Sequence, residues 1–528
     1  MKRTGFLGID AGTQGLSVIF TDDELRILAA GEAGYGMVPG LGGECYEQDP
    51  ADWERALAAA MADLRRKLSA LGVEPDVRAI GICGQMHGEV LADELGRSLG
   101  PARLWCDGRN EAEGHELTER LGTKMPKRIT AARWLWTIRN RADVAMKAAH
   151  LTTPAGWLAF RLTGGWTLGI GDASGMFPID QSALDYDARL LAGFDALVHA
   201  AGGGRSIPPL RDLLPQVRRA GQDGGSLDGH GASVLGLPVG TPVAPAEGDQ
   251  PAALTGSLIG TAGTVSMSFG TSVVANAVGD RPFTGIARSV DHFCAPDGKP
   301  INMVWLRNGT TALNAVVEMF GRVDGGGRGD GFAAVIPQLL AAPDDCGGLL
   351  ALPFMDDEPG LGVSHGGSAS VVGLNEKNAT PGNVARAMLL ATMFNLRLGS
   401  EPLDAQKFPR SEIILSGGLA KTPALGQLLA DVFNAPVTIL DGGVEGTAWG
   451  AALMAKYRSL AIAGRAPDWA AFLTGHASGT PTRFTPRLQS VAMLSDRYAR
   501  HRRLVALHAQ LAQATRDDVH GFGAGGKQ

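Results

Sequence analysis

Two short apolar strands, one in each half of the chain, run into the same kind of glycine turn, and this repeat limits the possible folds most. Residues 6–9 lead into Asp-Ala-Gly-Thr at residues 10–13, and residues 264–269 lead into Gly-Thr-Ser at residues 270–272. Strands and helices alternate after each turn, so the repeat predicts two related α/β halves around a cleft. The chain of 528 residues is long enough for both, because one hydrophobic core rarely exceeds ~250–300 residues.

The first half begins as an antiparallel meander with the polar turn at one edge. Strands are expected at residues 6–9, 16–20, 25–30 and 77–83. Asp49 directly before Pro50 predicts the start of a helix that runs to about residue 71. The strand at residues 77–83 ends in Gly-Gln-Met-His-Gly, which we interpret as an exposed loop tip.

The remaining strands and helices are separated by glycine-rich segments. Strands are expected at residues 242–246, 264–269, 412–415 and 437–440, and helices at residues 422–433, 447–457 and 494–514. Glycines are concentrated at residues 201–232 and 321–331, which we interpret as surface loops.

Composition argues against several classes of protein and partner. A net charge of −6 argues against a nucleic-acid partner. Five widely spaced cysteines without a Cys-x-x-Cys pair argue against a disulfide framework and a cysteine zinc site. The uncharged stretch at residues 251–279 holds 13 Gly, Ser or Thr among 29 residues, so we interpret it as two short buried strands rather than a membrane span. We therefore expect a cytoplasmic protein without a membrane partner.

The two glycine turns have the chemistry of phosphate-binding sites. Backbone N–H groups around Gly12 can hold phosphate oxygens, the Thr13 hydroxyl can donate to phosphate, and the Asp10 carboxylate can hold Mg²⁺ through water. A single turn of this kind is more often an ordinary hairpin turn, but Gly270 and Thr271 follow a second buried strand. Two such turns can clamp a polyphosphate from both sides, as phosphoryl transfer requires. Neither matches the P-loop pattern.

Asp249 is the candidate catalytic base. A kinase that acts on an alcohol needs a carboxylate to accept the proton of the attacking hydroxyl, and Asp249 follows an expected strand. Gly248 allows a ligand to approach closely, while strand alternation points Glu247 the same way and makes it a competitor. In the alternative interpretation, Asp249 only caps a helix that begins at about Pro251.

Two more turns offer contacts for substrates. Met86 provides an adaptable apolar wall, and His87 can donate a hydrogen bond to a sugar hydroxyl, although a single histidine is more often structural. Ser416-Gly417-Gly418 lets a flat group such as adenine or ribose lie against bare backbone, and a plain strand-to-helix turn is the alternative.

These segments together resemble the FGGY family of carbohydrate kinases, within the actin-like ATPase superfamily. Residues 8–13 and 268–272 are similar to the family's two phosphate turns, and Asp249 falls where the family keeps its catalytic aspartate. Gly-Gln-Met-His-Gly at residues 84–88 and Trp-Cys-Asp-Gly-Arg at residues 105–109 are similar to segments of its xylulokinase branch. The resemblance covers most of the chain.

The resemblance implies a fold and an activity. The fold would be α/β, with two actin-like (ribonuclease H-like) ATPase domains around a central cleft. Residues 1–258 would hold the sugar and the first phosphate turn, residues 259–490 the nucleotide, and residues 491–528 would form a helical tail. The activity would be ATP-dependent phosphorylation of a terminal hydroxyl of a small ketose, D-xylulose first, with ATP and Mg²⁺.

The resemblance also implies roles for individual residues. Asp249 would be the catalytic base, and the substrate would be bound by Met86, His87, Asp249 and Gln250. The nucleotide would be bound by Asp10, Gly12, Thr13, Gly270, Thr271, Gly309 and Gly418, with Asp10 holding the metal through water.

Two departures from the family pattern keep other acceptors open. Residues 352–359 lack the arginine of the family's Gly-Glu-Arg-Thr/Ser-Pro segment, and Arg133 stands where a lysine is usual. The alternatives are a kinase for ribulose, sedoheptulose or an erythritol-like polyol, or a non-catalytic nucleotide-binding module. The expected partner is a small sugar or polyol, and a homodimer is a further expectation.

Overall fold

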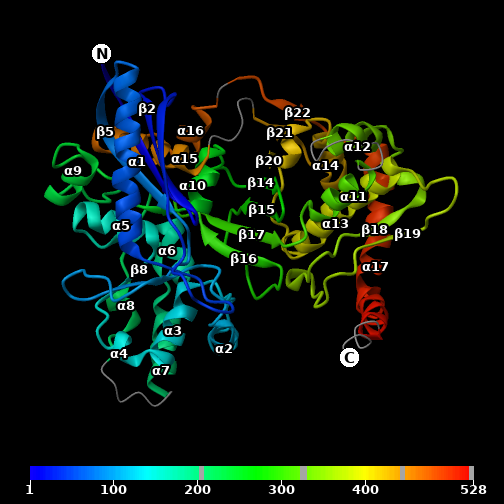
Figure 1. Cartoon of the computed structure of the whole chain (residues 1–528), viewed down its shortest axis with the longest axis horizontal. Coiled ribbons are helices and arrows are strands. Elements are labelled where there is room, and N and C mark those ends of the chain that lie inside the picture. The colour runs from blue at the N-terminus through cyan, green and yellow to red at the C-terminus, as the bar shows by residue number, and fades with distance from the viewer. Residues whose placement is uncertain (201–206, 322–329, 441–445, 478, 522–528) are drawn as a thin grey trace, which may run out of the picture.

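Two large sheets, one in each half of the chain, carry the architecture (Figure 1). The computed structural model describes residues 1–200, 207–321, 330–440, 446–477 and 479–521. Figure 1 shows the first half, in blue, cyan and green, beside most of the second half, in green to red, while the orange helices α15 and α16 lie against the first half. We call these halves the first and second lobes.

The first sheet brings three strand ends to one edge. Its order is β13-β5-β1-β2-β3. The strands are β1 (Lys2–Ala11), β2 (Gly15–Asp22), β3 (Ile27–Gly34), β5 (Glu74–Gly84) and β13 (Glu247–Gly248). β1 and β13 both run parallel to β5, so Ala11 and Gly248 each pair with Gly84. Ligands of α/β sheets bind beyond such C-terminal strand ends. The expected meander of β1, β2 and β3 is confirmed.

Helix α1 (Pro50–Ala70) packs on β2 and β3. Asp49 caps it by accepting the Ala51 N–H at 2.9 Å, and Pro50 occupies the first helical position. Trp53 and Leu57 lie on its buried stripe. The helix predicted from the Asp-Pro pair is therefore confirmed.

The second sheet has seven strands in the order β16-β17-β15-β14-β20-β21-β22. These are β14 (Thr264–Phe269), β15 (Val273–Val278), β16 (Val290–Cys294), β17 (Pro300–Leu306), β20 (Glu412–Gly417), β21 (Val437–Ile439) and β22 (Thr482–Phe484). Its helices are α11 (Thr311–Gly321), α12 (Asp330–Ala341), α13 (Pro381–Ala405), α14 (Leu425–Phe433) and α17 (Leu488–Gly521). Leu494 and Tyr498 of α17 belong to the core of this lobe.

Helix α15 (Thr447–Ile462) crosses back to the first sheet and packs on β1, β5 and α10 (Asp249–Gly256). Glycines make this contact possible: a Cβ at Gly8 would lie 2.0 Å from the Ala448 carbonyl oxygen, and one at Gly81 would lie 1.8 Å from that of Ala451. Helix α16 (Trp469–Thr474) joins the same apolar cluster. The domain division expected from the sequence stays a prediction.

Shorter elements complete the two lobes. In the first lobe they are β4 (Glu47–Gln48), β6 (Val90–Ala92), β7 (Ala102–Arg103), α2 (Glu111–Leu121), α3 (Thr130–Asn140), α4 (Ala142–Ala145), β8 (His150–Thr152), α5 (Pro154–Thr163), β9 (Thr167–Gly169), α6 (Ile170–Met176), β10 (Ile179–Asp180), β11 (Asp185–Tyr186), α7 (Ala188–Ala200), α8 (Leu210–Leu213), β12 (Gln216–Arg218) and α9 (Gly229–Leu235). In the second they are η1 (Cys346–Gly348), β18 (Leu350–Leu352), η2 (Pro359–Leu361), β19 (Ser370–Val372) and η3 (Gly418–Lys421).

Three expectations about elements need correction. The strand expected at residues 242–246 is reduced to two isolated bridges, Ile80 with Val243 and Ser226 with Pro242, since prolines at 242 and 245 lack the N–H that a ladder needs. The strand that pairs with β5 over two residues is β13. The segment expected as a loop at residues 201–232 contains α8, β12 and part of α9, while residues 201–206 lie outside those described. The stretch at residues 251–279, expected to form two short buried strands, contains most of α10 in addition to the strands β14 and β15.

The loop expected at residues 321–331 falls mainly on residues 322–329, which lie outside those described. Over the described ranges, none of the helices has both the length and the apolar character to cross a membrane.

Candidate active site

The first glycine turn joins β1 to β2. Tyr35 donates its hydroxyl to the Gly12 carbonyl. The Thr13 hydroxyl donates to Gln85 Oε1 at 3.2 Å and accepts from Trp105 Nε1 at 3.1 Å. The Thr13 hydroxyl would therefore have to break its hydrogen bond to Gln85 before it could donate to a phosphate.

The second glycine turn lies beyond the ends of the parallel strands β14 and β20. The Gly309 N–H donates to the Thr271 carbonyl at 2.9 Å, and a Cβ at Gly309 would lie 2.3 Å from the Gly270 carbonyl oxygen. A Cβ at Gly418 would lie 3.2 Å from the carbonyl oxygen of Phe269, the last residue of β14. Gly270, Thr271 and Gly418 are exposed. The structure thus brings together the four second-lobe residues that the sequence predicts for the nucleotide.

Asp249 is the first residue of α10 and directly follows β13. The cap position belongs to Gly248 and Asp249 is the first helical residue, so the interpretation of Asp249 as the cap of a helix that begins at about Pro251 is wrong. The backbone N–H groups of Gln250, of Asp249 itself and of Met86 lie close enough to its carboxylate to lower its pKa. Burial and, second, the charge of Asp10 raise the pKa of Asp249 to about 7. A carboxyl group that titrates near neutral pH is suited to accept a proton.

Asp10 lies at the C-terminal end of β1, and burial raises its pKa. The Thr447 hydroxyl donates to one carboxylate oxygen, and the Cys83 thiol lies 3.6 Å from the other. Thr447 opens α15 and is 437 residues away in sequence. Sequence analysis missed it, and its only signal is another Gly-Thr pair at residues 446–447.

The negative charge of Asp10 contributes to the raised pKa of Asp249, so the two carboxylates repel each other. Such a pair fits a divalent cation, because positive charge removes the repulsion and carboxylate oxygens are ligands of Mg²⁺. The described part of the chain holds no group of three or more His, Cys, Asp or Glu suited to a metal. Water and phosphate would therefore supply most ligands, as is usual for Mg²⁺.

Met86 and His87 lie directly beyond β5. Met86 is buried, and a Cβ at Gly248 would lie 2.2 Å from its Cγ. His87 Nδ1 lies 2.9 Å from the Gly175 carbonyl oxygen, so Nδ1 must carry the hydrogen. Burial lowers the pKa of His87 to about 3, which leaves Nε2 as an acceptor.

These contacts correct two expectations. His87 would accept a hydrogen bond from a sugar hydroxyl rather than donate one. The turn that carries it is largely buried and is not an exposed loop tip. Gln250, beside Asp249, reaches the second lobe, where Asn276 Nδ2 donates to its Oε1 at 3.4 Å.

Glu247 does not compete with Asp249 for the role of base. Its carboxyl oxygens accept the N–H groups of Gly171 at 3.3 Å and Asp172 at 2.9 Å, at the start of α6. Asp172 is fully buried, and Thr153 donates to its Oδ2 at 2.6 Å. Burial raises the pKa of Asp172 to about 8 and that of Glu247 well above its ordinary value. Sequence analysis did not find this second carboxyl pair.

Family models match both halves of the chain. The N-terminal domain of the FGGY family of carbohydrate kinases matches residues 6–256, and the C-terminal domain of that family matches residues 265–459. The chain belongs to the FGGY family of carbohydrate kinases. It is therefore a sugar phosphotransferase of an ATP-dependent family.

Individual relatives of this FGGY kinase carry different substrate names. A xylulose kinase of Haemophilus influenzae is 28% identical over 468 residues, which cover 86% of this chain and 90% of that protein. A glycerol kinase of Paracidovorax citrulli is 28% identical over 499 residues, which cover 87% and 92%. The structure of ligand-bound xylulose kinase from Lactobacillus acidophilus has a TM-score of 0.80 at 19% identity and covers 97% and 100%. The structural likeness confirms two actin-like, ribonuclease H-like α/β domains.

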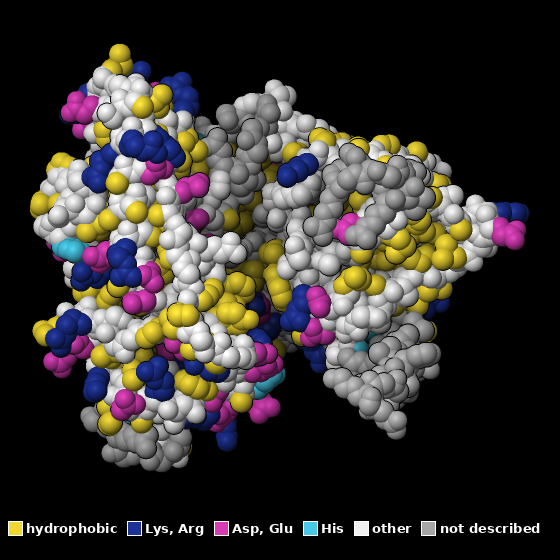
Figure 2. All heavy atoms as spheres, viewed as in Figure 1, with side chains coloured by type: hydrophobic (Ala, Val, Ile, Leu, Met, Phe, Trp, Pro, Cys, Tyr) yellow, Lys and Arg dark blue, Asp and Glu magenta, His cyan; other side chains and the backbone are white. Residues whose placement is uncertain are grey.

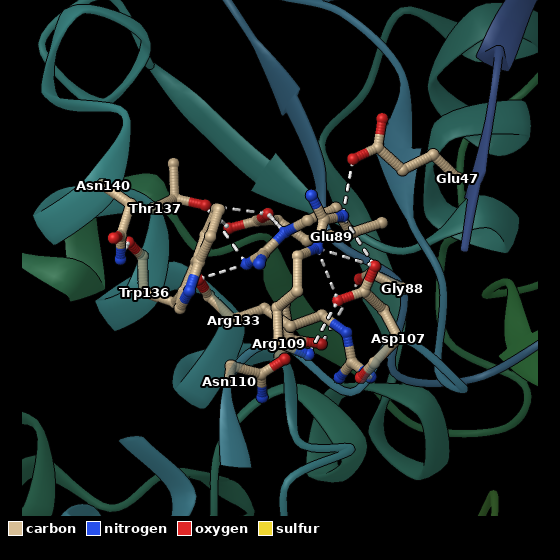
Figure 3. A network of polar contacts seen from close by, with 12 residues as sticks. Glu47, Gly88, Glu89, Asp107, Arg109, Asn110, Arg133, Trp136, Thr137 and Asn140 are labelled. Atoms are coloured by element: carbon tan, nitrogen blue, oxygen red, sulfur yellow. Dashed lines mark hydrogen bonds and ion pairs between the residues drawn. The ribbon is translucent and has the colours of Figure 1, made fainter. Parts of the chain in front are cut away.

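A buried polar network supports the Trp-Cys-Asp-Gly-Arg segment of this FGGY kinase (Figure 3). Arg133 donates to the carbonyl oxygens of Leu104 at 2.9 Å and Trp105 at 2.7 Å. Arg109 pairs with Asp107 and with Glu47 of β4. The arginine at position 133 thus holds the backbone that places Trp105 on Thr13, which gives this departure from the family pattern a structural role.

Proposed function

We propose that this FGGY kinase transfers the γ-phosphoryl group of MgATP to a terminal hydroxyl of a small ketose, D-xylulose first. One observation supports this most: Asp249 directly follows Gly248, which pairs with Gly84 at the end of β5, and burial and the charge of Asp10 raise the pKa of Asp249 to about 7. The candidate base Asp249, the first glycine turn and the turn of Met86 and His87 thus lie at one edge of the first sheet.

In the proposed mechanism, Asp249 accepts the proton of the acceptor hydroxyl as that oxygen attacks phosphorus. Backbone groups at Gly12 and at the turn of Gly270 and Thr271 orient the phosphates from the two lobes. Asp10 would hold Mg²⁺ through water, and the cation would neutralise phosphate charge. The surface is hollowed between the lobes (Figure 2), and closure there would exclude water, which would otherwise take the phosphoryl group.

A coupled assay of ADP release over a panel of ketoses and polyols tests the proposal. We expect D-xylulose to stimulate ATP turnover most, and no stimulation by any sugar or polyol would refute the kinase mechanism. A second candidate acceptor is another ketose or a polyol, favoured by the similarity to a glycerol kinase and by the absence of arginine at residues 352–359. A cytoplasmic location and a homodimer stay predictions from the sequence.

A further inference from the structure

A cavity of about 170 Å³ lies between the lobes beside His87. The first lobe contributes His87 and the segment around Lys124, and the second lobe contributes Phe283, His292 and other residues of β16 and β17. The volume is many times what holds one water molecule, so the cavity has room for part of an organic ligand. Asp249 does not line it.

The cavity is nevertheless next to the candidate base. Asp249 directly follows Gly248, where a Cβ would lie 2.2 Å from Met86 Cγ, and the residue after Met86, His87, lines the cavity. Met86 also packs in a cluster with Phe293 and Met303, which line the same cavity. An acceptor whose reacting hydroxyl lies at Asp249 would thus extend past the peptide between Met86 and His87 into the space between the lobes.

Each lobe offers an imidazole acceptor to this space. His87 uses Nδ1 to donate to the Gly175 carbonyl, which leaves Nε2 to accept. On the opposite wall, His292 Nδ1 lies 3.0 Å from Oδ1 of the fully buried Asn302. Desolvation and the Lys124 ammonium lower the pKa of His292 to about 4, so it is neutral and its Nε2 also accepts.

The Lys124 ammonium group beside the cavity is already committed to protein groups. Lys124 Nζ donates to the carbonyl oxygens of Arg288 at 2.6 Å and Val290 at 3.0 Å, and it lies 2.7 Å from Asp291 Oδ1. These contacts use all three hydrogens of the ammonium group. Arg128 pairs with the same Asp291 carboxylate. The cavity therefore presents acceptors to hydroxyl donors and has no free lysine ammonium for a carboxylate of the ligand.

We propose that this interlobe cavity binds the end of the acceptor remote from the reacting hydroxyl, and that His292 is a specificity-determining residue that accepts a hydrogen bond from a hydroxyl there. The substrate class is a neutral ketose or polyol longer than glycerol. This inference rests on the proposed function, and it adds that the substrate contacts both lobes.

Three substitutions of His292 separate ligand binding from support of the fold. In H292Q, the longer amide places an acceptor near the position of Nε2. In H292N, the shorter amide keeps only a polar group near the position of Nδ1, and H292A has neither group. We expect H292A and H292N to raise KM for D-xylulose by about fivefold to tenfold, the effect of one hydrogen bond. H292Q should restore most of the affinity, and KM for ATP should not change. His230→Ala is the control, since His230 is exposed and pairs with Glu54 outside the cavity.

Calorimetric titration with glycerol, D-xylulose and gluconate completes the test. Glycerol binding should be equal in wild type and H292A, because glycerol is too short to reach the cavity. Rescue by Asn instead of Gln, an equal loss for glycerol, or tighter binding of gluconate than of D-xylulose would overturn the inference while leaving the kinase activity intact. If no acceptor stimulates ATP turnover in the wild type, the proposed function fails, whereas D-xylulose binding that depends on His292 would still support the cavity as a polyol site.

Discussion

Asp249 has two properties at the residue scale that a catalytic base needs. It lies at the start of α10, directly after β13 and beside the end of β5, and burial together with the charge of Asp10 shifts its titration toward neutral pH. Two positions earlier, the carboxyl group of Glu247 instead accepts the Asp172 N–H and is anchored to α6. A shift of two residues thus separates a free base from a structural carboxyl group.

Asp249→Asn should lower kcat by ~10²–10⁴-fold and leave KM for the sugar nearly unchanged, because the amide cannot accept the proton. In the wild type, kcat/KM should rise with pH through about 7, since only the deprotonated carboxylate is active. Steady-state kinetics between pH 5 and 9, a range chosen around that value, measure both effects. A kcat close to that of the wild type would remove Asp249 from the mechanism.

Asp172→Asn should stabilise the protein more at alkaline than at acid pH. The folded-state pKa of about 8 lies above the ordinary 3.8, so protonated Asp172 favours the fold below pH 3.8 and this contribution is lost as pH rises through about 8. The Tm of the variant minus that of the wild type should therefore grow over this interval, by a few degrees.

Asp180→Asn is the control for this experiment. The Asp180 pKa is lowered by hydrogen bonds from Ser182, so its contribution to stability is instead lost as pH falls. A Tm difference for Asp172→Asn that does not depend on pH would show that Asp172 is charged in the folded protein.

At the element scale, α6 links three parts of the molecule: β13, which precedes Asp249, the turn of His87 in the first lobe, and β16 in the second lobe. Glu247 holds its first N–H groups, Gly175 accepts from His87, and Ser174 Oγ accepts the Cys294 N–H of β16 at 2.9 Å. The helix has only seven residues and lacks a side-chain cap of its own, so Glu247 from a distant strand replaces one.

Glu247→Gln should destabilise the protein by ~1–3 kcal/mol, because an amide N–H would face the backbone N–H groups of α6. We also expect KM for the sugar to rise while KM for ATP stays constant, since α6 fixes the tautomer of His87. Chemical denaturation and steady-state kinetics measure the two effects. Glu94→Gln is the matched control at an exposed position, and equal behaviour of the two variants would contradict the role of Glu247.

Sequence reasoning succeeded where a local signal determines an element. The Asp-Pro pair predicted the start of α1, and the strand expected at residues 264–269 before the second glycine turn has the observed bounds of β14. It failed at residues 242–246, because pairing there is interrupted by prolines, and at α8 and β12, which are too short to have a periodic pattern. β12 exists because it pairs with β9, which no local signal reports.

At the scale of the whole molecule, one carboxylate beside the cavity forms ion pairs between the two lobes. Asp291 of the second lobe pairs with Lys124 and Arg128 of the first, and the three side chains are largely buried. Charged hydrogen bonds of this kind stabilise more than neutral ones, so the contact favours the observed arrangement of the lobes.

Asp291→Asn should shift the equilibrium toward an open arrangement by about tenfold, the effect of one charged hydrogen bond. Small-angle scattering should then give a larger radius of gyration for the ligand-free variant than for the wild type. Asp297→Asn is the matched control, because Asp297 pairs with Lys299 inside its own lobe. Identical scattering of Asp291→Asn and the wild type would exclude a role for this contact in closure.

The sequence by itself determined the strands that end in glycine turns, the helix start at Asp49 and the residue types able to hold phosphate, since these depend on neighbours in the chain. The tertiary structure alone decided that Thr447 donates to Asp10 across 437 residues, that Glu247 is anchored to α6, and that His87 and His292 face one cavity. The reason is physical: hydrogen-bond partners and burial set the tautomer of a histidine and the pKa of a carboxyl group, and both are created when distant segments pack together.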